Sequence, residues 1–168
     1  MTVQATPAPD KVLLVHEIGF ANAAALLHRY GLQLHRVDDD APIPGSYWGE
    51  PEAGIVGINV YVRCDTPVHS MLHEACHLVV LPDERRHAVH TDATDSVAEE
   101  DAVCLLQALL GDALPGVGRD RVFADMDAWG YTFRLGSARA YFEQDADAAW
   151  AWLRERGLVD AQRRLLPA

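Results

Sequence analysis

Basic residues are scarce in this chain. Its 168 residues include 14 Lys and Arg against 25 Asp and Glu, which gives a formal net charge of −11. A surface of this sign repels phosphate backbones. The adjacent Arg163 and Arg164 form too short a cluster to make a basic stripe. We therefore expect no nucleic-acid partner.

Cysteines and long apolar runs are also few. The three cysteines are an odd, sparse set, which favours reduced thiols over a disulfide framework. Near the start, the longest apolar run covers residues 12–15, too short for the hydrophobic region of a signal peptide or for a membrane span. These features predict a cytoplasmic protein with no membrane partner.

The length and the hydrophobic fraction of 49% suit one domain with a single core. Residues 1–10, with Pro7 and Pro9, are predicted to form a flexible leader. Residues 11–168 then form the domain, with its core in residues 20–111 and a helical and aromatic extension in residues 112–168.

Hydrophobic periodicity predicts an α+β fold in which a small sheet packs on two helices. The expected helices cover residues 20–31, closed by Gly31, and residues 65–82, 96–111 and 145–157. The expected strands are 32–37 and 55–62, separated by a loop rich in turn formers. The aromatic residues at 129, 131 and 133 alternate like one face of a further strand, which packs on the helices or forms a wall for substrate.

Residues 73–77 read His-Glu-x-x-His within the second expected helix, for which Thr66 is a suitable cap and Pro82 a stop. A helix brings His73 and His77 onto one face, one turn apart, so both rings can reach one cation. Two imidazoles and a carboxylate are a typical donor set for catalytic Zn²⁺. Glu74 is then placed to act as a general base toward a water molecule. We therefore predict one zinc ion.

The third ligand is sought among the polar residues that follow: His87, His90, Asp92, Asp95, Glu99, Glu100 and Asp101. Glu99 is favoured because it falls on the edge of the apolar arc of its helix, whereas Glu100 points nearly opposite. Two alternatives stay open. Ser96 and Glu99 have capping-box spacing, so Glu99 can instead fold back on the helix end. His69, His87 or His90 would then be the third ligand.

The chain resembles the small gluzincin metallopeptidases of the ImmA/IrrE type, which cleave or otherwise relieve transcriptional repressors. The resemblance rests on segments 21–31, 54–62, 69–80 and 99–110, which together span about half of the chain, residues 21–110. It implies that His73, His77 and Glu99 are zinc ligands and that Glu74 is the general base. The chain departs from the family at Val103, where Asn or Asp often contacts a zinc-bound histidine, and at residues 111–112, which replace a Met-Pro pair.

The sequence thus predicts a zinc-dependent metallopeptidase acting on a peptide or protein substrate. The substrate is expected to lie extended along a sheet edge within residues 55–62. An oxyanion stabiliser is expected too, with Tyr131 and His90 as candidates. The alternative is a catalytically inactive binding or regulatory module that keeps the same fold; the intact Glu74 argues against it.

Overall fold

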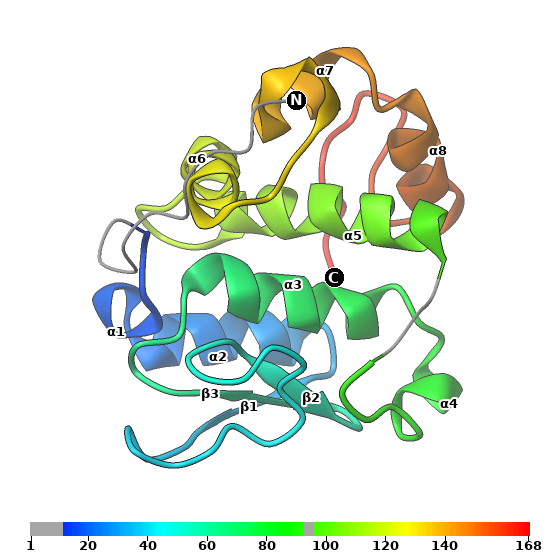
Figure 1. The fold of residues 1–168 in the computed structure, drawn as a ribbon. Helices are drawn as coiled ribbons and strands as arrows, with labels where there is room; N and C mark the ends of the chain where they lie inside the picture. The colour runs from blue at the N-terminus through cyan, green and yellow to red at the C-terminus, as the bar shows by residue number, and fades with distance from the viewer. Residues whose placement is uncertain (1–11, 93–95) are drawn as a thin grey trace.

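The structure is a computed structural model that describes residues 12–92 and 96–168, so the expected leader at residues 1–10 lies outside the described residues. The described residues form helices and a small three-stranded sheet, joined by loops, which confirms the α+β class (Figure 1). In the described part of the chain, no helix combines the length and the apolar character that crossing a bilayer requires.

The sheet has the strand order β1-β3-β2, with β1 at Gln33–Arg36, β2 at Gly54–Val56 and β3 at Asn59–Val62. The central strand β3 runs parallel to β1 and antiparallel to β2. The expectation of one strand over residues 55–62 is wrong. The chain reverses at Gly57, whose φ of 61° suits the first position of a tight hairpin turn.

Two helices precede the sheet, α1 at Val15–Ile18 and α2 at Phe20–Arg29. The expected helix over residues 20–31 is confirmed as α2, and Gly31 follows it with a φ of 78° that few other residues adopt. The chain then enters β1, against which α2 packs.

The His-Glu-x-x-His segment forms helix α3, Val68–Val79. Its N-cap is Pro67 rather than the expected Thr66. The Thr66 hydroxyl instead accepts a hydrogen bond from the Arg63 amide, at 2.8 Å, and so closes the preceding turn.

A short helix missed by the sequence analysis, α4 at Asp83–Arg86, follows α3. The Arg86 guanidinium is largely buried and donates hydrogen bonds to the carbonyl oxygens of Leu78, Val79 and Leu81 at the end of α3. It also donates to the Tyr30 carbonyl, at 2.9 Å. A cation thus satisfies the last carbonyls of α3, where the helix dipole favours positive charge.

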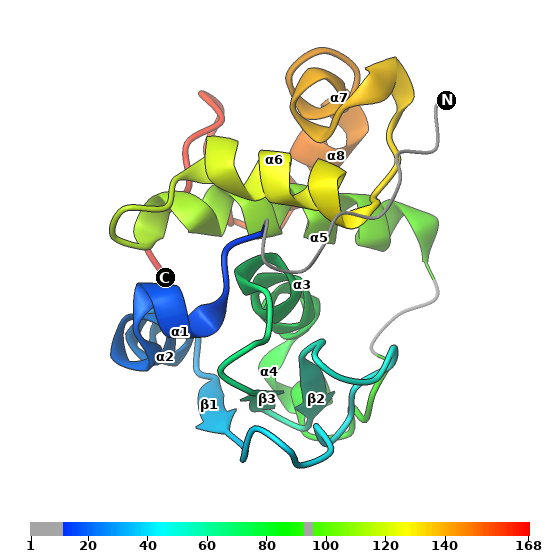
Figure 2. The ribbon, with the colours of Figure 1, turned by 60° about the vertical axis from the view of Figure 1, so that its left-hand side comes forward.

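Helix α5, Val97–Leu110, lies at the centre of the molecule (Figure 1). It packs against α3 on one side, and against α6 (Arg119–Trp129) and α8 (Asp147–Glu155) on others. Figure 2 shows α6, α7 (Ala138–Gln144) and α8 on the side of α5 that is remote from the sheet. Short 3-10 turns, η2 (Gly111–Ala113) and η3 (Arg134–Gly136), link these elements.

Residues 129–133 do not form the expected strand. Trp129 is the last residue of α6, and Gly130 ends that helix in a left-handed conformation with a φ of 112°. The chain then leads Tyr131 and Phe133 past α5 toward η3. These aromatic side chains pack partly on the core, and Tyr131 faces the cleft described below.

Candidate metal centre

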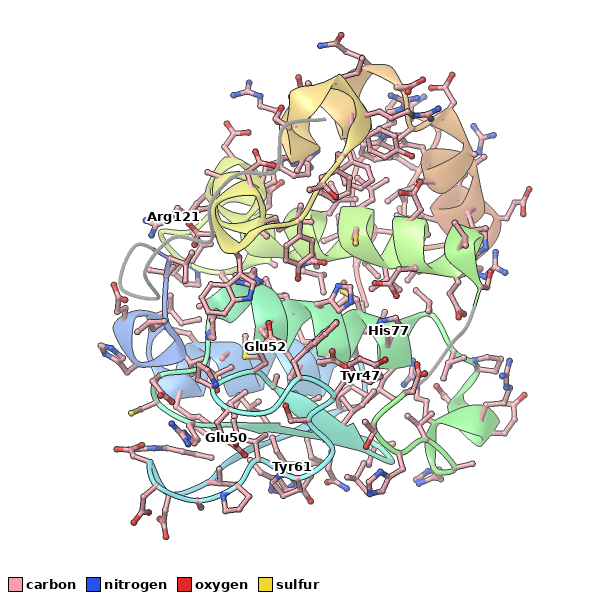
Figure 3. All side chains as sticks on the ribbon, viewed as in Figure 1. Tyr47, Glu50, Glu52, Tyr61, His77 and Arg121 are labelled. Atoms are coloured by element: carbon pink, nitrogen blue, oxygen red, sulfur yellow. The ribbon has the colours of Figure 1, made fainter. Side chains whose placement is uncertain are left out.

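Two histidines of α3 and one glutamate of α5 converge where the two helices pack. The Nε2 atoms of His73 and His77 lie 3.2 Å apart. One carboxylate oxygen of Glu100 is 2.8 Å from His73 Nε2, and its other oxygen is 3.1 Å from His77 Nε2. Figure 3 labels His77 on α3.

These separations suit a metal ion. With metal–ligand bonds of about 2.0–2.1 Å, the ligand atoms of a tetrahedral zinc site are about 3.3 Å apart. The observed distances between the three groups are close to this length. His73, His77 and Glu100 can therefore hold a metal ion. Imidazole and carboxylate donors accept zinc and several other divalent ions.

The predicted third ligand, Glu99, does not join this group, and Glu100 takes its place as the candidate ligand. Glu99 lines a separate groove with Pro82 and Arg156, and its amide donates to the Ser96 hydroxyl, at 3.3 Å. The apolar arc was a poor guide because α5 is buried on several sides: every residue from 102 to 110 is buried. The apolar residues therefore do not mark which side meets α3.

Gln107 completes the site and was missed by the sequence analysis. It lies two turns after Glu100 on α5 and is fully buried. Its Oε1 atom is 2.6 Å from His73 Nδ1, and its Nε2 atom donates to the His69 carbonyl, at 3.0 Å. A polar residue in an otherwise apolar stretch, two turns from an acid, is the sequence signal that points to it.

Among the described residues, none of the other candidate ligands belongs to the group of three donors. His69 is buried beneath the site, with Nδ1 at 3.3 Å from the Tyr131 hydroxyl, and burial lowers the pKa of its imidazole to about 3. His87 is exposed at the end of α4. His90 is exposed too, and its Nδ1 lies 2.7 Å from the Thr91 hydroxyl. Asp95 lies outside the described residues.

Glu74 is in the expected position for a general base. Its carboxylate lines the same cleft as His73 and Glu100. Burial raises the pKa of Glu74 to about 7, although the charges of the two neighbouring histidines act in the opposite direction. For Glu100, burial disfavours the charged form, but hydrogen bonds from His73 and His77 outweigh it and lower the pKa.

A cleft passes over the three donors. One compartment, of about 660 Å³, is bounded by the loop 48–52 and by residues 129–131. A second, of about 610 Å³, lies beyond Glu100, and its wall includes the aromatic residues Tyr131, Phe133 and Tyr141. A third, of about 250 Å³, adjoins His77 and Tyr47. Figure 3 labels Tyr47 and Glu52 on the loop that passes below α3 in this view.

The structure contradicts the expectation that a substrate lies along the sheet within residues 55–62. Strand β3 has a partner strand on each side. The outer edge of β2 is already covered: the Ile55 amide donates to Gly45 O, and Ile55 O accepts from the Thr91 amide at 2.9 Å. Because these backbone groups are paired, a substrate strand cannot add to this edge.

Of the two candidates for an oxyanion stabiliser, Tyr131 lines the cleft beside the three candidate ligands. These ligands, His73, His77 and Glu100, are called the metal group below. Its ring lies edge-on to His73, with centroids 6.1 Å apart. Burial raises the pKa of the Tyr131 hydroxyl to about 12, so the group keeps its proton at neutral pH and can donate a hydrogen bond. His90 does not line the compartments that contain the three donors.

Comparison with known proteins found no match, whether to a protein-family model, to a curated protein or to a solved structure. The resemblance to gluzincins therefore stays a prediction from the residues themselves.

Proposed function

We propose that the protein is a zinc-dependent hydrolase of peptide bonds with a zincin-like fold. One observation carries the proposal: the Nε2 atoms of His73 and His77 and the carboxylate of Glu100 converge in a cleft that the Glu74 carboxylate also lines. A purely structural cluster has no need of this fourth group.

In this proposal His73, His77 and Glu100 hold the ion, and Gln107 orients the His73 ring so that Nε2 faces the site. Bound zinc lowers the pKa of a water molecule to about 7 and polarises a carbonyl group. Glu74 accepts the proton of the attacking water and passes it to the departing amine. Tyr131 donates a hydrogen bond to the oxygen on which negative charge develops.

A peptide is the proposed substrate because the cleft has compartments on both sides of Glu100. An extended chain can cross the site and place side chains in each. Since the sheet edge is covered, the chain is held by the walls of the cleft rather than by an added strand.

The order of a strand, the histidine helix and then the glutamate helix supports a relationship with ImmA/IrrE-type gluzincins. With Glu100 as the ligand, the family's Asn or Asp position, four residues on, falls on Cys104, which is also a departure. The contact to a zinc-binding histidine that the family makes through Asn or Asp is made here by Gln107, from further along α5.

The test is metal content together with cleavage of a fluorogenic peptide library, for the parent protein and for Glu74→Gln. We expect near-stoichiometric zinc in both proteins and cleavage by the parent alone. The proposal fails if the parent takes up no metal when zinc is offered at neutral pH, or if Glu74→Gln cleaves as fast as the parent.

A further inference from the structure

A hydrogen bond joins the two walls of the compartment of about 660 Å³, which are the loop 48–52 and residues 129–131. The indole Nε1 of Trp129, at the end of α6, donates to Glu52 Oε1 at 2.8 Å, although the two residues are 77 positions apart in the sequence. Within the described part of the chain, no other hydrogen bond to the Glu52 carboxylate is present. One oxygen is thus held in place, and the other is left for a ligand.

The compartment has acidic groups without matching cations. Glu50, Glu52, Glu74 and Glu100 line it, and His73 is the only described lining residue that can carry positive charge. His73 is committed to the metal group. Glu50 differs from Glu52, because its carboxylate accepts a hydrogen bond from the Ile43 amide, at 2.8 Å, and so stabilises the loop to which it belongs.

Glu52 is therefore a half-buried carboxylate without a cationic partner. Burial raises the pKa of Glu52, and the hydrogen bond from Trp129 offsets this effect only in part. A cation beside the carboxylate would favour its charged form and replace the solvation that burial removes.

Aromatic rings supply a second element of cation recognition. Trp48, Trp129 and Tyr131 line the same compartment, and the Trp48 side chain is 77% exposed at its mouth. Indole and phenol rings attract ammonium and guanidinium groups through their π faces. A carboxylate that an indole holds in place, among aromatic walls, fits a cation better than a neutral side chain.

We propose that this compartment binds a positively charged group of the substrate, with Glu52 as the recognition carboxylate. The group is the side chain of Lys or Arg, or a free amino terminus, since all three present N–H donors with a positive charge. A volume of about 660 Å³ accommodates such a side chain with the adjoining backbone. The inference rests on the proposed function only in taking the ligand to be a peptide.

The experiment measures binding without cleavage, in the Glu74→Gln protein with zinc added. Acetylated Ala/Gln nonapeptides carry one lysine at each position in turn, and a matched series carries norleucine. A third series has norleucine and a free amino terminus. We expect the best lysine peptide, or the free-amino series, to bind at least tenfold more tightly than its neutral match, as a charge-assisted hydrogen bond predicts. The series that gains affinity identifies the source of the cation.

Adding Glu52→Gln should bring the charged and neutral peptides to equal affinity. Trp129→Phe, which keeps an aromatic ring but loses the N–H, should reduce the preference. Glu84→Gln on exposed α4 makes the same charge change away from the cleft and should retain it.

Equal affinity for charged and neutral peptides, no binding of any series, or a preference that survives Glu52→Gln would overturn the proposal. Failure of the parent to cleave peptides would instead count against the hydrolase alone, since the binding preference is measured without turnover.

Discussion

His73 Nδ1 lies 2.6 Å from Gln107 Oε1. The Gln107 amide nitrogen donates to the His69 carbonyl, so the amide oxygen is the atom that faces the imidazole. An amide oxygen only accepts hydrogen bonds, so Nδ1 of His73 carries a proton. In the neutral ring, Nε2 then has a free lone pair directed at the metal group. Gln107 thereby selects the tautomer that binds metal.

Replacing Gln107 by Leu, of similar size, should weaken zinc binding by about 10- to 100-fold, because the His73 ring loses the partner that sets its tautomer and orientation. Competition with a chelating dye measures the affinity. Gln107→Glu keeps an acceptor for Nδ1–H and should bind more tightly than Gln107→Leu. Equal affinity in the Leu variant and the parent would remove Gln107 from the site.

The neighbouring residues Glu99 and Glu100 form a matched pair for testing the third ligand. Glu100→Ala removes the carboxylate that faces both histidines and should abolish stoichiometric zinc binding. Glu99→Ala changes the charge equally but alters a groove remote from the metal group, so zinc should stay bound. Elemental analysis of the purified proteins distinguishes the two. The reverse pattern would restore Glu99 as the ligand.

His69 should make the metal-free protein sensitive to acid. Burial lowers the pKa of folded His69 to about 3, whereas an unfolded histidine titrates near 6.5. Between these values the unfolded chain binds a proton that the folded protein excludes, so stability falls as pH falls.

In urea unfolding between pH 6 and 4, His69→Gln should flatten this dependence by up to about 1.4 kcal/mol per pH unit relative to the parent. The comparison uses slopes, so a change in absolute stability does not affect it. Parallel slopes would show that His69 is not the responsible group.

Arg86→Met should lower the free energy of unfolding by roughly 3 kcal/mol, because several buried carbonyl groups lose a charged donor. Chemical denaturation followed by circular dichroism measures the loss. Arg85→Met, at the adjacent exposed position, should change stability by no more than about 0.5 kcal/mol. Similar effects of the two substitutions would contradict the capping role of Arg86.

The parts of the site that depend on local spacing could be predicted from the sequence. His73, Glu74 and His77 lie as a helix must place them, and the helix itself is predicted by hydrophobic periodicity and by Pro82, which stops it. The third donor depends on which side of α5 meets α3, and only tertiary packing decides this. A helix that is buried on several sides has no single apolar face to reveal its neighbour.

The sheet and the aromatic segment show the same limit. The pattern of residues 55–62 fits a strand throughout, and only Gly57 marks the reversal. The alternating aromatic residues at 129, 131 and 133 also fit a strand, but Trp129 belongs to α6 and Gly130 ends that helix. In both places a single glycine changes the direction of the chain. Hydrophobic periodicity does not reveal this change, because it reports only which residues are apolar.

Helix α5 is buried along part of its length only, so the residues around the metal group differ in how easily the structure opens locally around them. Gln107 sits in the fully buried part of the helix, whereas Glu100 lies in the first turn with its side chain 46% exposed. Amide hydrogens near Gln107 should therefore exchange with solvent only through global unfolding, while those near Glu100 exchange through fraying of the helix end. A bound ion would then begin to dissociate at the carboxylate, with both imidazoles still in place.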